Sequence, residues 1–184
     1  KFFPYCNFMT FIRMLIIVFF ISNPIFARGY DVFGIGYYDI KFDGSSTNEA
    51  IDFRYERRFD KVLVDIGPEE DNFFYLKPFA GIEITSKSAY YILGGIYLED
   101  NLGQLFTGDK SNFVFTPSFG AGYYDDGNGK KLGNKIEFRT TLEISYEMQN
   151  KNRIGLSFSH ISNANIGNKN PGVEIISLSY QIPY

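Results

Sequence analysis

The chain of 184 residues suits one domain, and its formal net charge of −3 argues against a nucleic-acid-binding surface. Aromatic residues make up 18% of the chain, with 14 Tyr, 20 Phe and no Trp, and glycine is frequent. The single cysteine, Cys6, cannot form an internal disulfide. Because no Cys/His cluster is present in the sequence, we predict no metal site.

The first segment has the pattern of an export signal. Arg13 precedes the apolar run Met14 to Ile21, and residues 25–27 offer a small-residue cleavage site. The apolar run is too short for a helix that spans a membrane. The sequence therefore predicts a signal peptide over residues 1–27 and one mature domain over residues 28–184.

Two alternatives remain open for this segment. The chain opens without a methionine, so Met9 could be the true initiator, and the residues before it, Cys6 included, would then be an untranslated extension. The segment could also be retained as a membrane anchor, although its apolar run is short.

Beyond residue 27, alternation of apolar and polar residues predicts strands, and no helical periodicity is evident. The Gly-, Asn- and Asp-rich linkers between the strands are typical of turns. An even number of strands of about ten residues can close an antiparallel barrel and leave no exposed edge. The export signal and the aromatic content favour the outer membrane, so we predict an all-β, eight-stranded, antiparallel, up-and-down transmembrane β-barrel. The predicted strands cover residues 30–41, 50–59, 74–85, 89–99, 112–124, 135–148, 153–162 and 173–184.

The charged side chains of these strands should face the barrel interior. An eight-stranded barrel is only wide enough to be filled by its own side chains, so we expect a packed lumen with paired charges and not a pore. The sequence does not define the structure of segment 60–72, because this segment could extend a strand or fold over the rim. The inward charges are Arg54, Arg58, Glu137, Arg139 and Glu143.

The chemically distinctive stretch lies in the last two predicted strands. His160, the only histidine, is two residues from Ser162, and Glu174 opens the next strand. A hydroxyl, an imidazole and a carboxylate are the groups that an activated serine requires. Counting by twos places all three on the lipid-facing side at one rim, which is extracellular if the first strand starts in the periplasm. An ionisable group on a lipid-facing wall suggests function, although these residues could also just end their strands in the headgroup zone.

The run HISNANIGNKNPGVE resembles the signature of the lipid A 3-O-deacylase (PagL-type) family, which are outer-membrane esterases built on an eight-stranded barrel. The segments LKPFAGIEITS, LGNKIEFRTTLEISY and LSFSH are also similar to the family, so the resemblance spans most of the predicted mature chain. The signature is matched by His160, Ser162, Asn163, Asn170, Pro171, Gly172 and Glu174.

The resemblance implies a role for each residue. Ser162 would be the nucleophile, His160 the general base and Glu174 the group that orients the base. Asn170 would contribute to the oxyanion hole, with Asn163 and the backbone around Gly172 as further contributors. For Asn163, a role in the turn alone is an equal alternative, because asparagine favours turns.

The substrate implied by the family is lipid A, the membrane anchor of lipopolysaccharide. The expected reaction is hydrolysis of the ester-linked hydroxyacyl chain at the 3-position by a serine esterase in the bacterial outer membrane, without a cofactor. An apolar stripe on the outer wall would receive the acyl chains. The stripe consists of Ile154, Leu156, Phe158, Leu178 and Tyr180.

Two other functions compete with this interpretation. The main alternative is a non-enzymatic outer-membrane barrel with a structural or binding role. The second is a soluble ligand-binding barrel of the lipocalin type, which would require an apolar interior. The sequence leaves open whether the protein forms a homodimer.

Overall fold

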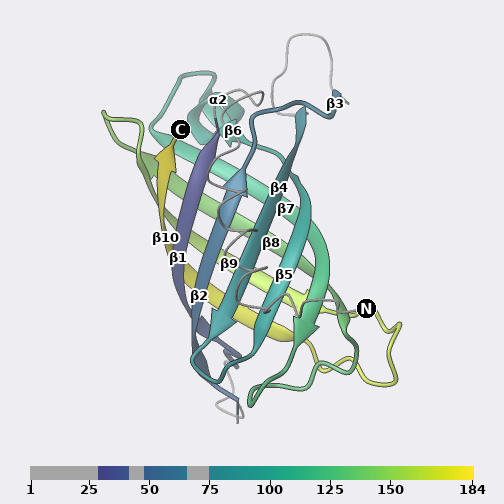
Figure 1. Ribbon diagram of the computed structural model, residues 1–184. Coiled ribbons are helices and arrows are strands. Elements are labelled where there is room, and N and C mark those ends of the chain that lie inside the picture. Colours follow the sequence, from purple (N-terminus) through teal and green to yellow (C-terminus); the bar gives the residue numbers. More distant parts are fainter. Residues whose placement is uncertain (1–28, 42–47, 66–74) are drawn as a thin grey trace, which may run out of the picture.

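The structure, a computed structural model, describes residues 29–41, 48–65 and 75–184. Eight long strands in these residues form a closed antiparallel barrel, in which each strand pairs with its neighbours along the chain and the last pairs with the first (Figure 1). This confirms the predicted fold. The predicted signal peptide and Cys6 lie outside the described residues. The strands are β1 (Tyr30–Tyr38), β2 (Ala50–Arg58), β4 (Tyr75–Thr85), β5 (Tyr90–Tyr97), β7 (Phe113–Asp125), β8 (Ile136–Glu147), β9 (Arg153–Ser162) and β10 (Val173–Pro183).

Three short elements lie between the long strands at one end of the barrel. β3 (Val64–Asp65) pairs with the start of β4, so the part of segment 60–72 that is described extends the sheet. β6 (Asp100–Asn101) pairs with β7 and leads into helix α2 (Leu102–Thr107). The sequence predicted no helix here, because six residues are too few to show a helical period. In the described part of the chain, no helix is long and apolar enough to cross a membrane.

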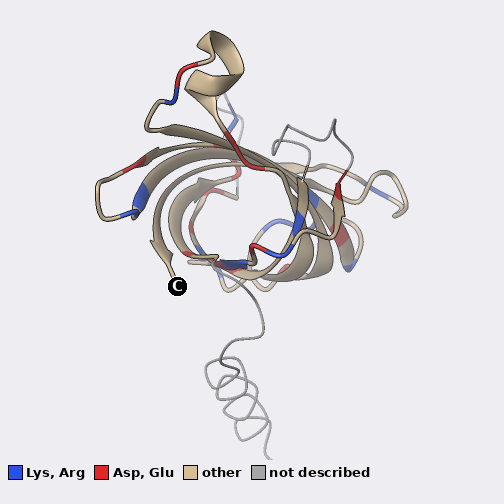
Figure 2. Ribbon diagram, turned by 90° about the horizontal axis from the view of Figure 1, so that it is seen from above, with Lys and Arg blue, Asp and Glu red and all other residues tan. Residues whose placement is uncertain are grey.

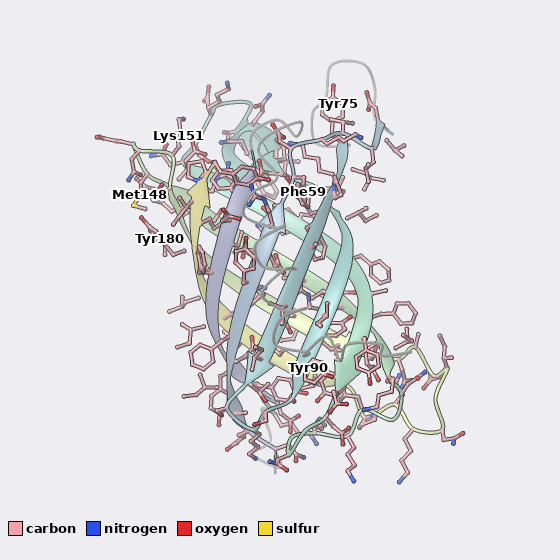
Figure 3. All side chains as sticks on the ribbon, viewed as in Figure 1. Phe59, Tyr75, Tyr90, Met148, Lys151 and Tyr180 are labelled. Carbon is pink, nitrogen blue, oxygen red and sulfur yellow. The ribbon has the colours of Figure 1, made fainter. Side chains whose placement is uncertain are left out.

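The outer wall is apolar, as the alternation predicted. Apolar side chains project outward along every long strand, and polar side chains alternate with them on the inside (Figure 3). Leu156 and Leu178, which face each other on β9 and β10, are 56% and 58% exposed, as side chains in contact with lipid would be. Aromatic residues mark both ends, with Tyr180 towards one rim and Tyr90 at the other (Figure 3). A belt of this kind belongs to a barrel that sits in the outer membrane.

The barrel interior is filled by a network of buried charges. Glu143 Oε1 accepts hydrogen bonds from Arg58 Nη1 at 2.7 Å and Gln181 Nε2 at 2.8 Å, and its Oε2 accepts from Arg54 Nη2 at 3.2 Å. Arg139 completes the network through ion pairs with two further carboxylates. Seen from above, the strands close into a ring (Figure 2). A polar lumen of this kind does not fit the lipocalin alternative.

The pairing predicted for the inward charges is confirmed for the arginines and Glu143 but not for Glu137. Glu137 is fully buried, but among the described residues it forms no ion pair. It lies at the start of β8, away from Arg54 and Arg58, which pair with Glu143 further along the same strand.

Replacing Glu143 with alanine should destabilise the barrel severely. The change leaves the guanidinium groups of Arg54 and Arg58 buried without this partner, and breaking a buried pair from one side costs about 3–5 kcal/mol. The urea midpoint for unfolding in detergent should fall strongly. Glu147→Ala, which removes a more exposed carboxylate at the rim of the same strand, should shift the midpoint far less. Equal shifts for the two variants would show that the network does not stabilise the fold.

The two rims of the barrel differ in what they carry. At one rim, which we call the chain-end rim, the start of β1 pairs with the end of β10, and α2 lies at the same end of the barrel but across the ring from them (Figures 1 and 2). The opposite rim, which we call the site rim, holds the connection from β9 to β10 at residues 163–172 and the connection from β7 to β8 at residues 126–135. The candidate catalytic residues lie at the site rim.

Candidate active site

The register of the last two strands places a histidine and a glutamate side by side. His160 on β9 is directly opposite Glu174 on β10, and both side chains point away from the lumen. The imidazole Nδ1 lies 3.1 Å from Glu174 Oε1, within hydrogen-bond distance. This bond fixes the ring orientation and leaves Nε2 as the nitrogen that can exchange a proton.

Ser162 lies on the same outer face, two residues beyond His160, and is partly exposed. On the other side, across the sheet, it is opposite Phe138 of β8. Within the described residues, Ser162 Oγ makes no hydrogen bond to the imidazole. Side chains at alternate positions of a strand are about 7 Å apart at their backbones, so a side-chain rotation is needed to bring the hydroxyl to Nε2. Catalytic hydrogen bonds are often long in unliganded enzymes and shorten when substrate binds.

The two asparagines of the connection have different surroundings. Asn163 is fully buried, and its Nδ2 donates hydrogen bonds to Leu132 O at 2.8 Å and to Lys169 O at 2.7 Å. Its backbone N donates to Asn170 Oδ1 at 3.0 Å. This bond fixes the orientation of the Asn170 amide, because only the oxygen can accept it, and leaves the Asn170 Nδ2 donors without a partner among the described residues.

The connection at 126–135 supports the site from the side. Its Gly133 has φ +96° and packs so closely on the backbone of Lys169 that a Cβ would lie 2.2 Å from the Lys169 carbonyl oxygen. A buried ion pair between Lys130 and Asp39 joins the same connection, 126–135, to the end of β1. The two connections therefore form one packed cap. Sequence inspection missed this contribution, because residues 126–135 read only as a turn-rich linker.

Gly172 lies directly against the imidazole. Its φ is +60°, and a Cβ at this position would lie 2.9 Å from His160 Cε1. Only glycine adopts this backbone conformation without strain while leaving room for the ring. The connection therefore restricts the imidazole from one side, while Glu174 restricts it from the other.

For the ester hydrolysis expected from the sequence, Gly172→Ala should lower the rate about 100-fold without unfolding the barrel, because the added methyl group must displace either the ring or the backbone of the connection. Gly108→Ala is the matched control, since Gly108 has φ +80° but no atom within 4 Å of its Cβ position. Ester hydrolysis by the two purified variants tests this directly. If both variants keep full activity, Gly172 does not position the imidazole.

An apolar stripe leads from the pair along the outer wall, as predicted. Phe158 and Ile176 face each other next to His160 and Glu174, and Ile154 faces Tyr180 towards the opposite rim. The side chains of the stripe predicted from the sequence are between 40% and 58% exposed. Among the described residues, no group of three or more His, Cys, Asp or Glu side chains could hold a metal ion. The site thus consists of polar groups at one end of a lipid-facing apolar surface.

Comparison with known proteins places this arrangement in a family. The family model described as lipid A 3-O-deacylase (PagL) matches residues 74–183, which include both strands and the connection that carry the site. The chain belongs to the lipid A 3-O-deacylase (PagL) family. The match begins at the residue before β4, so β1 and β2 lie outside it.

Individual relatives agree with the family assignment. A protein of Bordetella bronchiseptica named lipid A deacylase PagL is 39% identical over 51 residues, a match that spans 28% of this chain and 29% of the relative. The crystal structure of the outer membrane enzyme PagL superposes with a TM-score of 0.61 at 16% identity and covers 86% of this chain and all of that one. A de novo designed transmembrane β-barrel has a TM-score of 0.56 at 10% identity, over 85% of this chain and 95% of the design. At such low identities, the two structures support the fold alone.

Proposed function

We propose that this protein is a lipid A 3-O-deacylase, which hydrolyses the ester that links a hydroxyacyl chain to the 3-position of lipid A. The observation that carries the proposal is the His160–Glu174 hydrogen bond on the lipid-facing wall, with Ser162 on the same face. The charges in the lumen are explained by their role in stabilising the fold. An imidazole and a carboxylate that face lipid have no such role, and placing them there costs free energy, so their position suggests catalysis.

The proposed reaction follows the logic of a serine esterase. His160 Nε2 takes the proton of Ser162 Oγ as the oxygen attacks the ester carbonyl, and Glu174 stabilises the imidazolium that forms. The imidazolium then gives its proton to the sugar oxygen that leaves. Water, activated in turn by His160, hydrolyses the acyl-enzyme and releases the fatty acid. No metal or organic cofactor takes part in these steps.

Negative charge that develops on the carbonyl oxygen needs fixed donors. The free Nδ2 of Asn170 and the backbone N–H groups around Gly172 are suitable, because both belong to the connection that packs against His160. Asn163 has a different role in this proposal. Both hydrogens of its side-chain amide are engaged by backbone carbonyls, so it holds the connection in place and is not itself a donor to the oxyanion.

A site on the outer wall suits a substrate that never leaves the membrane. Lipid A could diffuse within its leaflet to the site rim, place its head group beside the two connections and lay its acyl chains along the apolar stripe. With the chain ends in the periplasm, the site rim faces the outer leaflet, where lipopolysaccharide resides. Lipid A would then be both the membrane lipid that the barrel contacts and its substrate.

Mass spectrometry of lipid A tests the function. Expression in a Gram-negative host whose lipid A keeps its 3-linked chain should remove the mass of one hydroxyacyl group and release the free fatty acid. A non-enzymatic barrel would leave the lipid A unchanged although the protein is assembled. Loss of a chain from another position would show a deacylase with a different specificity.

A further inference from the structure

Helix α2 presents apolar side chains that nothing in the described protein covers. Phe106 is 82% exposed and Leu105 is 42% exposed, and the helix has no buried residue. Seen down the barrel axis, the helix lies outside the ring of strands and not over the lumen (Figure 2). An aromatic side chain this exposed is unusual in water and suggests a surface that another phase covers.

The pairing of β6 fixes the height of the helix. Asn101, the last residue before α2, lies opposite Val114 of β7, and Asp100 lies opposite Phe115. Phe113, which faces outward two residues before Phe115 on β7, is 48% exposed and packs edge-on against Tyr146 at a ring-centroid distance of 5.4 Å. The helix therefore begins level with the aromatic belt, and its apolar surface continues the lipid-facing wall outward at the chain-end rim.

The loop that carries α2 is built to hold this position. Asn101 Oδ1 accepts hydrogen bonds from Gly103 N at 3.1 Å, Gln104 N at 3.2 Å and Ser111 N at 2.9 Å. Gly108 ends the helix with φ +80°. A cap that satisfies the first turn and ties both ends of the loop together leaves little freedom for Phe106 to turn inward.

We propose that α2 is an interfacial anchor, which inserts Phe106 and Leu105 into the headgroup boundary of the leaflet at the chain-end rim. The ligand is a phospholipid surface, and the anchor sets the depth and tilt of the barrel. Apolar and aromatic side chains on a short surface helix partition into this boundary, while the charged side chains of the next residues, Asp109 and Lys110, stay in the headgroup water. The proposal depends on the barrel fold and not on the hydrolase activity.

A single-tryptophan probe tests the anchor, because the chain contains no Trp. The full chain with Phe106→Trp, assembled in phosphatidylcholine vesicles, should lose at least about half of its emission when the lipids are brominated near the glycerol end of their acyl chains. Bromine at the middle of the chains should quench less. Phe119→Trp, on the lipid-facing wall of β7, is the positive control, and Phe79→Trp, buried in the lumen, is the negative control.

Gln104→Trp gives a matched control on the same helix, because residues two apart lie on opposite sides. It should be quenched less than Phe106→Trp. Unquenched, water-like emission from Phe106→Trp, or equal quenching at both positions, would overturn the proposal. Leu105→Trp provides the same measurement if the first variant fails to assemble, with the same outcome expected.

Discussion

Ser162→Ala is expected to abolish deacylation of lipid A while the barrel assembles normally. Removing the nucleophile of a catalytic triad lowers turnover by about 10⁴-fold or more, because no other group can form the acyl-enzyme. The lipid A of cells that express the variant should keep its full mass, and purified variant should release no fatty acid.

Ser159→Ala is the matched control for this prediction. Ser159 lies on the same strand, three residues away, but it points into the lumen and is hydrogen-bonded to Thr141 Oγ1 at 2.8 Å. Its replacement should leave most of the deacylation intact. If Ser162→Ala remains active, or if Ser159→Ala is the inactive variant, the nucleophile has been misassigned.

His160→Gln is expected to reduce hydrolysis by about 10³–10⁴-fold, since no other imidazole is present in the chain to take the serine proton. The wild-type rate should fall as the pH is lowered, because a protonated imidazole can no longer act as a base. The residual rate of the variant should not show this fall. Initial rates with a detergent-dispersed ester, measured from pH 5 to pH 9 in steps of about one unit, show whether the rate depends on His160 as a base.

The two cross-strand neighbours of His160 provide controls. Glu174→Gln keeps the size of the hydrogen-bonded partner but loses its charge, and it should cost a large part of the activity. Thr140, opposite His160 on β8, makes no polar contact with it among the described residues, so Thr140→Ala should stay close to wild type. A flat wild-type pH profile, or equal effects of the two neighbours, would argue against His160 as the base.

The fold was predictable from sequence because its determinants are local. Alternation with period two follows from the geometry of a strand with lipid on one side and a polar lumen on the other, as in Ile154 to Phe158. The same counting placed His160 and Glu174 on the outer wall, and the register confirms it. Helix α2 was missed because its six residues are shorter than the pattern that would reveal them.

The support of the site was not predictable, because it depends on contacts between distant segments. Asn163 bonds to Leu132, which is 31 residues away, and no local pattern links them. Lys130 likewise reaches Asp39 across the barrel mouth. Such contacts decide whether an asparagine faces the substrate or holds a turn. The resemblance left Asn163 with two possible roles, a contribution to the oxyanion hole or a role in the turn alone, and its hydrogen bonds to both connections support the second.

Covalent labelling tests the central proposal most directly. A long-chain alkyl phosphonate ester with a good leaving group mimics the tetrahedral intermediate and should modify one residue of the membrane-embedded protein. Peptide mapping by mass spectrometry should find the adduct on Ser162, and His160→Gln should prevent it. An adduct on another residue, or an unlabelled protein that still releases fatty acid, would contradict an acyl-enzyme mechanism at the outer wall.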